Sequence, residues 1–322
     1  MGPLIFTPEF KERIWGGQKL KTVYSKEIPF EHTGESWEIA CHDNGQSIVT
    51  EGQFKGLTLN ELLVNNGQEV IGKTFAEGDK FPLLLKIIDA KSDLSVQVHP
   101  DDAYAAINEK GEFGKSEAWI VLEADPGAKL VIGLVEGTTK ESFTKAIEEG
   151  HLATVLNQLE VKAGDVIDIP AGLVHAIGTG ILLAEIQQNS DTTYRVYDWD
   201  RVGLDGKGRE LHIEQSLDTI DFEGVHSTQC ASGTTEEYKG YSHTKYISNS
   251  YFALESIEVK EAYQDTRVND FEIFMVIDGD GTLKGDFETI ILKKGDSLII
   301  PNATNSYTFQ GKMKLFKSYV PQ

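Results

Sequence analysis

The chain has 322 residues, of which 40% are hydrophobic and 25% are charged, as expected for a globular protein with one large or two modest domains. Its formal net charge of −21 argues against a broad surface for nucleic acid or anionic membranes, because lysine and arginine provide that affinity. A small anionic ligand stays possible, since it needs only a few local cations.

Neither the cysteines nor the apolar runs point to a secreted or membrane-bound protein. Cys41 and Cys230 are too few and too far apart for a disulfide framework or a cysteine zinc site. No apolar run approaches membrane-spanning length, and residues 1–17 lack the sustained apolar core of a signal peptide. We therefore expect a cytoplasmic protein with two free thiols and with no nucleic-acid or membrane partner.

Short apolar segments bounded by turn residues predict a mainly β fold. In chain order, strands are expected at residues 34–40, 46–49, 81–90, 119–124, 129–134, 161–169 and 181–187. The run at 81–90 is the densest, and Lys86 interrupts it. A buried lysine must be paired or solvated. Lys86 therefore either lines a pocket or lies at a sheet edge with its head in water.

Helices are expected as insertions between these strands. The insertions are expected at about residues 56–72, 138–159 and 209–220. Two of them begin with a capping-box pattern, Thr58 with Glu61 and Thr138 with Glu141. A polar stretch rich in serine, threonine and glycine follows the third insertion, and it is typical of a domain boundary. We expect a first domain at residues 1–222, a linker at 223–244 and a second domain at 245–322.

An internal repeat indicates how the two expected domains are related. Residues 164–175 (GDVIDIPAGLVH) match residues 295–306 (GDSLIIPNATNS) in the spacing of glycine, aspartate, proline and the apolar positions. The first copy is similar to the second signature motif of the cupin superfamily, whose members are small antiparallel jelly-roll barrels. In the second copy Ser306 stands where His175 stands in the first. The repeat thus predicts two cupin barrels, of which only the first keeps this metal-ligand position.

Four residues at expected strand ends form a candidate metal site. Gln97 and His99 are two residues apart at the end of a strand, so they share a face. Glu117 and His175 also lie beside turns. Two imidazoles, a carboxylate and an amide oxygen form a mixed set suited to zinc or a similar divalent ion. Taken singly, His175 is more often a structural histidine, Gln97 and His99 are compatible with polar residues at a strand end, and Glu117 with a solvated hairpin.

A second polar cluster, at residues 184–195, follows this set. Glu185 comes ten residues after His175, as the returning strand of the same barrel would place it. Arg195 is one of few arginines in an acidic chain, and a surface salt bridge is its simplest alternative role. Near the start, the Trp15–Gly16–Gly17 segment on its own indicates a turn with a packed tryptophan.

Together these segments resemble the type I mannose-6-phosphate isomerases, particularly their shorter bacterial form. The resemblance rests on Trp15–Gly16–Gly17, on Leu-Ser-Val-Gln-Val-His-Pro at 94–100, on Lys115-Ser-Glu117, on His175-Ala, and on Asn189-Ser-Asp191 with Arg195. It covers essentially the whole chain. One departure is Ile177, where longer family members commonly carry tyrosine. A second is the reduced C-terminal half, so the resemblance does not assign the phosphate contacts that this half makes elsewhere in the family.

The resemblance implies one zinc ion per chain, held by Gln97, His99, Glu117 and His175. It also places four catalytic candidates around the substrate: Lys115, Glu185, Asp191 and Arg195. Three further residues are expected to bind substrate: Trp15, Lys86 and Ser95.

The reaction implied is the interconversion of mannose 6-phosphate and fructose 6-phosphate through a cis-enediol. A lysine beside a divalent cation has a lowered pKa, which makes Lys115 a candidate proton carrier, with Glu185 as a second base. Asp191 would assist ring opening, and Arg195 would stabilise the enediolate or contact phosphate. A sugar-phosphate sensor and an iron dioxygenase are alternative classes, and the dioxygenase fits this ligand set less well. We expect a monomer whose only partner is a small sugar phosphate.

Overall fold

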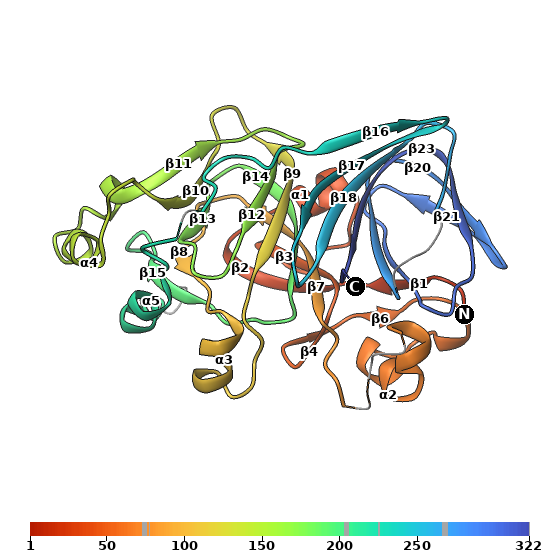
Figure 1. Cartoon of the computed structure of the whole chain (residues 1–322), viewed down its shortest axis with the longest axis horizontal. Coiled ribbons are helices and arrows are strands. Elements are labelled where there is room, and N and C mark those ends of the chain that lie inside the picture. Colours follow the sequence, from red (N-terminus) through yellow and green to blue (C-terminus); the bar gives the residue numbers. More distant parts are fainter. Residues whose placement is uncertain (73–75, 77, 203–205, 225, 266–269, 322) are drawn as a thin grey trace.

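The computed structural model describes residues 1–72, 76, 78–202, 206–224, 226–265 and 270–321, and most of its elements are strands (Figure 1). This confirms the prediction of a mainly β fold. Three large sheets form the framework, and the short helices lie between and beside them. No helix in the described part of the chain is both long and apolar enough to cross a bilayer.

A six-stranded antiparallel sheet forms the centre of the N-terminal half, with strand order β12-β9-β14-β7-β2-β3. Its strands are β2 (Glu9–Gly17), β3 (Thr33–Ile39), β7 (Leu83–Ala90), β9 (Glu117–Ala124), β12 (Val166–Ile169) and β14 (Ile181–Gln188). Every residue of β7 and β14 is buried, so both faces of these strands are covered. This explains why the sequence of β7 reads as one apolar run.

A five-stranded sheet, in the order β11-β10-β13-β8-β15, accompanies the first sheet. Its strands are β8 (Val96–Val98), β10 (Lys129–Leu134), β11 (Leu156–Glu160), β13 (His175–Ile177) and β15 (Tyr194–Tyr197). A small hairpin of β4 (Cys41–His42) and β5 (Gly45–Gln46) stands apart from both sheets. Cys41 and Cys230 are free thiols, as expected.

The third sheet has ten strands and contains most of the C-terminal half. Its members are β1 (Leu4–Thr7), β6 (Ile48–Val49), β16 (Thr234–Tyr238), β17 (Tyr241–Ser248), β18 (Ala253–Val259), β19 (Ala262–Gln264), β20 (Glu272–Gly285), β21 (Phe287–Lys293), β22 (Ser297–Ile300) and β23 (Tyr307–Tyr319). Strands β1 and β6 come from the start of the chain, and β1 pairs directly with β22.

In the described part of the chain, one α-helix lies in each of the three predicted insertions and two more lie outside them. The helices are α1 (Lys19–Tyr24), α2 (Leu59–Val70), α3 (Asp102–Asn108), α4 (Lys140–Glu148) and α5 (Ile213–Thr219), with 3₁₀ turns η1 (Gly52–Phe54) and η2 (Leu152–Val155). Thr58 and Glu61 form the predicted capping box of α2. The box of α4 is formed by Thr139 and Ser142 and not by Thr138 and Glu141, because the Thr139 side chain accepts from the Ser142 amide.

Two stretches have a secondary structure other than the expected one. The helical insertion at 138–159 ends early, because β11 (Leu156–Glu160) hydrogen-bonds to β10. The expected linker at 223–244 contains strand β16 and the start of β17. All residues of β16 are exposed. Exposure explains the polar sequence of β16, and this polar sequence is what made the segment resemble a linker.

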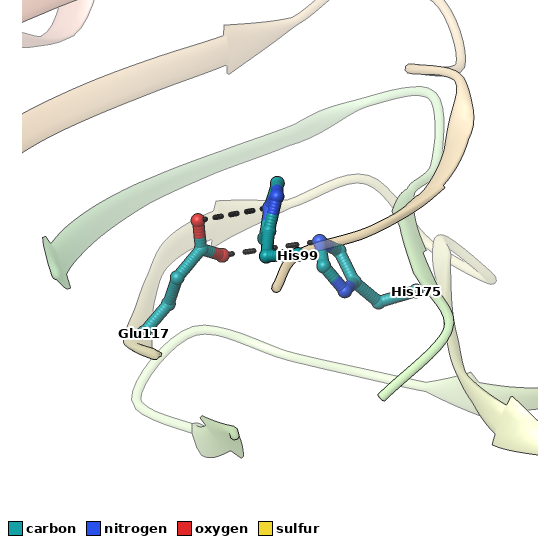
Figure 2. A group of neighbouring side chains, drawn as sticks. All are labelled: His99, Glu117 and His175. Carbon is teal, nitrogen blue, oxygen red and sulfur yellow. Dashed lines mark ion pairs between the residues drawn. The ribbon is translucent and has the colours of Figure 1, made fainter. Parts of the chain in front are cut away.

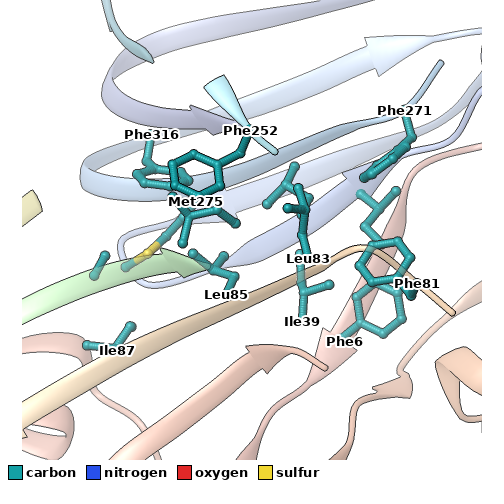
Figure 3. Packing of buried hydrophobic residues seen from close by; sticks show 14 of the residues in the cluster. Phe6, Ile39, Phe81, Leu83, Leu85, Ile87, Phe252, Phe271, Met275 and Phe316 are labelled. Atoms are coloured by element: carbon teal, nitrogen blue, oxygen red, sulfur yellow. The ribbon is translucent and has the colours of Figure 1, made fainter. Parts of the chain in front are cut away.

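The largest hydrophobic cluster joins the six-stranded and ten-stranded sheets (Figure 3). Leu83, Leu85 and Ile87 of β7 contribute to it, and so do Met275 of β20 and Phe316 of β23. Because side chains alternate along a strand, the residues between these point the other way, into each half's own interior. The candidate active site lies on that opposite face of the six-stranded sheet.

Candidate active site

Three side chains from three strand ends converge in the interior of the N-terminal half (Figure 2). His99 directly follows β8, Glu117 begins β9 and His175 begins β13. Residues 170–174 form the turn that leads into β13, with Leu173 N bonded to Pro170 O. The strands thus fix the backbone positions of the three residues, and the adjoining loops allow their side chains to meet.

The donor atoms of these residues are close enough to share one ion. One ligand atom from each lies within 4.8 Å of the others, and all three residues are buried. Nε2 of His99 is 3.3 Å from Oε1 of Glu117, and Nε2 of His175 is 3.9 Å from Oε2. Nδ1 of His175 donates a hydrogen bond to Leu173 O at 2.9 Å. The lone pair of Nε2 is then available to bind a metal. The group fits a divalent ion that accepts nitrogen and oxygen ligands.

Gln97 completes the predicted ligand set. In the five-stranded sheet it pairs with His175 on one side and with Arg195 on the other. Its amide nitrogen lies 3.3 Å from Nε2 of His175. Rotating the amide by half a turn would present its oxygen at the same point. The structure therefore brings all four predicted metal ligands together.

The environment holds these groups in the protonation states that a metal requires. Burial, followed by the charge of Lys115, lowers the pKa of His99 to about 3. Burial likewise lowers the pKa of His175. For Glu117 burial acts in the opposite direction, but Lys115 and His99 hold the pKa of this carboxyl well below its usual value. Both imidazoles are thus neutral and the carboxylate is ionised.

Lys115 lies directly against the ligand group. Its Nζ is 2.8 Å from Oε1 of Glu117 and 3.2 Å from Nε2 of His99. Burial lowers the pKa of Lys115, but the carboxylates of Glu117 and Glu185 outweigh it, so the pKa is raised. The sequence predicted a lowered pKa for Lys115 on the assumption that a divalent cation lies beside its ammonium group. Among the chain's own groups the shift has the opposite sign.

A row of side chains crosses the six-stranded sheet next to the ligands. Trp119, Glu185, Lys86 and Trp37 occupy paired positions on β9, β14, β7 and β3. Nζ of Lys86 lies 3.5 Å from Oε1 of Glu185 and 4.9 Å from the ring centre of Trp37. Of the alternatives for Lys86, the structure shows a paired lysine in a pocket wall. Burial, with the charge of Glu117, raises the pKa of Glu185 to about 7.

A cavity of about 480 Å³ opens beside this row. It is lined by all three predicted substrate-binding residues and all four predicted catalytic residues: Trp15, Lys86, Ser95, Lys115, Glu185, Asp191 and Arg195. Gln97 and Ile177 also line it. Trp15 lies at the buried end of β2, where Gly16 approaches the chain so closely that a Cβ would be 2.4 Å from Gly34 N. The structure thus places every predicted residue in or directly behind one cavity.

Arg195 differs from the cavity's other cations in its surroundings. Its Nη1 donates to Glu210 O at 2.9 Å, while within the described ranges its buried Nε has no acceptor and the side chain forms no ion pair. Burial, and then the charge of Arg209, lowers its pKa. An anionic group of a ligand would satisfy this guanidinium. The surface salt bridge considered from the sequence is absent from this part of the structure.

Several residues in or next to the cavity were not predicted from the sequence. Arg209 reaches the cavity from residues 209–212, which dock on Arg195 through the pair of bonds between Arg195 and His212. Asn44, in the β4–β5 turn, donates to Asp191 at 2.9 Å. Trp119 is fully buried and donates to Glu117 at 3.1 Å and to Glu185 at 2.9 Å. Of these, only Trp119 had a sequence signal, since it follows Glu117 by two residues on one strand face.

Replacing Trp119 with phenylalanine removes the N–H that holds both carboxylates and keeps most of the ring. We expect the affinity for a divalent ion to fall by about 10–100-fold, as is usual when a supporting hydrogen bond to a ligand is lost. Competition with a chromophoric chelator measures this affinity without reference to turnover. Trp199→Phe is the matched control, because the Trp199 indole N–H donates to the backbone oxygen of Leu94 and not to a carboxylate. Unchanged affinity in Trp119→Phe would show that the indole only packs.

Comparison with known proteins places the whole chain in one family. Residues 4–120 match the family described as phosphomannose isomerase type I, catalytic domain, and residues 242–320 match mannose-6-phosphate isomerase, cupin domain. The chain is 40% identical over 318 residues to mannose-6-phosphate isomerase ManA of Bacillus subtilis strain 168, covering 99% of each protein.

Two further comparisons agree over nearly full length. Mannose-6-phosphate isomerase of Streptococcus mutans is 38% identical over 317 residues, with 98% of each protein covered. The crystal structure of the mannose 6-phosphate isomerase from Bacillus subtilis matches with a TM-score of 0.94 at 38% identity, covering 99% of this chain and 100% of that chain. The chain belongs to the type I phosphomannose isomerase family.

Proposed function

We propose that this protein is a zinc-dependent aldose–ketose isomerase that interconverts mannose 6-phosphate and fructose 6-phosphate through a cis-enediol. The observation that carries the proposal is the buried His99–Glu117–His175 group behind a cavity that also contains Lys115, Glu185 and Arg195. Membership of the type I phosphomannose isomerase family supports the choice of substrate and reaction.

The donor set supports zinc as the bound ion. Two neutral imidazoles and an ionised carboxylate, with the Gln97 amide beside them, suit a borderline ion better than magnesium or calcium, which prefer oxygen alone. Bound there, a divalent ion would act as a Lewis acid without changing its oxidation state. Gln97, His99, Glu117 and His175 are the proposed ligands.

The remaining cavity residues would handle the protons and the charge of the substrate. Isomerisation moves one proton between C2 and C1, and Lys115 and Glu185 are the two candidates to carry it. Asp191 would assist ring opening, because its carboxylate faces the cavity and is fixed by Asn44. Arg195 would stabilise the enediolate or contact the phosphate.

Three residues of the cavity wall, Trp15, Lys86 and Ser95, would contact the sugar phosphate. The proposal also includes the finer architecture predicted from the repeat, namely two cupin barrels at residues 1–222 and 245–322 joined through 223–244. The matching strand orders within the six-stranded and ten-stranded sheets support a duplicated unit. A monomer in the cytoplasm completes the proposal.

Removing and restoring the metal tests the proposed function directly. Turnover of mannose 6-phosphate to fructose 6-phosphate should disappear after chelation and removal of the chelator, and should return when zinc is added back. Metal analysis of each sample and circular dichroism provide the controls for metal content and folding. Activity that persists in protein shown to be metal-free would refute the ligand assignment. A folded, zinc-loaded sample without activity would instead indicate a sugar-phosphate sensor.

A further inference from the structure

A second group of buried charged side chains lies in the C-terminal half, far along the chain from the active-site residues. Nζ of Lys317 is 2.5 Å from Oδ2 of Asp265, 2.9 Å from Oε1 of Glu272 and 4.0 Å from Oε2 of Glu255. Lys317, Glu255 and Glu272 are buried, and Asp265 is half-buried. Three carboxylates thus surround one ammonium in a protein interior.

The strand pairing shows where this group lies relative to the internal repeat. The N-terminal repeat is β12-β9-β14-β7, and the C-terminal repeat, β22-β20-β23-β18, has its strands in the same order. The sequence repeat aligns Ile169 of β12 with Ile300 of β22. Ile169 pairs with Glu117, and Ile300 pairs with Glu272. Glu272 therefore occupies the position of the proposed metal ligand Glu117.

The same register continues across the next two strands. In the N-terminal repeat, Trp119 pairs with Glu185, and Glu185 pairs with Lys86. At the matching positions of the C-terminal repeat, Phe274 pairs with Lys317, and Lys317 pairs with Glu255. The acid–base pair of the active site is present with its charges exchanged, which places an ammonium next to the retained carboxylate.

Other differences remove the groups that a metal would use. Ser306 stands in place of His175, and Phe274 has no N–H to match that of Trp119. The hydroxyl of Tyr307 donates to Oε2 of Glu272 at 2.6 Å and to Asp265 at 3.1 Å. Both oxygens of Glu272 are therefore held by groups of the chain itself, one by Lys317 and the other by Tyr307.

We propose that the Lys317 ammonium does in the C-terminal repeat what a divalent cation is proposed to do in the N-terminal one. The ammonium compensates the negative charge of Glu272 and of the neighbouring carboxylates. This half therefore keeps the arrangement of a metal site, with the cation supplied by the chain itself. Buried carboxylates without such a partner would be strongly unfavourable. The lowered pKa values of Glu255 and Asp265, where burial is outweighed mainly by His243 and Lys317 respectively, agree with this role.

Thermal unfolding of the full chain tests the proposal through charge. Lys317→Met should lower the Tm by about 10 °C, as expected when one partner of a buried ion pair is removed. Lys312→Met, at an exposed position of the same strand, is the matched control and should stay within about 2 °C of wild type. Glu272→Gln combined with Lys317→Met should unfold at a higher temperature than Lys317→Met alone, because the neutral amide no longer needs compensation.

A second measurement asks whether a cation can replace the ammonium. Lys317→Ala opens space among oxygen donors, and we expect it to bind one Mn²⁺ more per chain than wild type, measured by electron paramagnetic resonance. Adding Glu272→Gln should remove that extra ion. If Lys317→Met does not fold, Lys317→Arg and the double variant should still fold. A Tm unchanged in Lys317→Met, a double variant no more stable than the single one, or a folded Lys317→Ala without the extra ion would overturn the proposal.

Discussion

Replacing His175 with alanine is expected to lower turnover of mannose 6-phosphate by at least about 10³-fold, because Lewis-acid catalysis by a metal supplies several kcal/mol. His175 is fully buried, and its ring is fixed by the contact with Leu173 O and by the edge of Trp119. Its loss leaves the ion without the ligand that faces Glu117 across the site. Steady-state kinetics together with zinc content per chain measure the effect.

The fold should survive this substitution, since alanine removes an imidazole that neighbouring polar groups surround. His151→Ala is the matched control, because His151 is exposed and far along the chain from the ligands. His151→Ala should retain wild-type turnover and zinc content. A His175→Ala protein that binds zinc stoichiometrically and turns over normally would remove His175 from the ligand set.

Lys115→Met is expected to lower kcat by about 10²–10⁴-fold, the usual contribution of a positioned acid or base. Methionine keeps the length of the side chain but cannot carry a proton. Zinc content should be retained, because Lys115 is not a proposed ligand. Lys162→Met is the control, since the Lys162 side chain is largely exposed and pairs with Asp165 nearby. A kcat near wild type in Lys115→Met would make Glu185 the remaining candidate base.

The dependence of kcat on pH separates these two candidates. Glu185 must be ionised to accept a proton, and burial raises its pKa to about 7, with Glu117 adding to the shift. If Glu185 is the base, kcat should rise with pH through this region and Glu185→Gln should lose both the rate and the acidic limb. If Lys115 is the base, Glu185→Gln should keep most of the rate, and kcat should not follow the ionisation of Glu185 near pH 7.

The sequence was most informative where chemistry and local structure coincide. Gln97 and His99 are two residues apart at a strand end, so their common direction follows from strand geometry alone. The repeat likewise reveals that His175 has no counterpart in the second copy. These features identified the candidate ligands, and the structure brings them together.

The pairing between distant strands could not be derived in this way. Nothing local indicates that Gln97 lies between His175 and Arg195, because that register depends on how the whole sheet assembles. Arg209 enters the cavity only because its segment docks along β15, so its own sequence carries no signal. Strand β16 was missed for another reason: an exposed edge strand needs no apolar residues.

The pairing of β1 with β22 has a consequence for how the chain can be made and cut. Leu4 lies beside Ile299, so during synthesis β1 must wait for the much later β22 before the hydrogen bonds between these two strands can form. Until β22 has been synthesised, β1 lacks this antiparallel partner. A protease cut within residues 223–244 would likewise leave β1 and β6 on a different fragment from most other strands of their sheet. The two halves of the chain are therefore interlocked, and neither fragment would carry all the strands of the ten-stranded sheet.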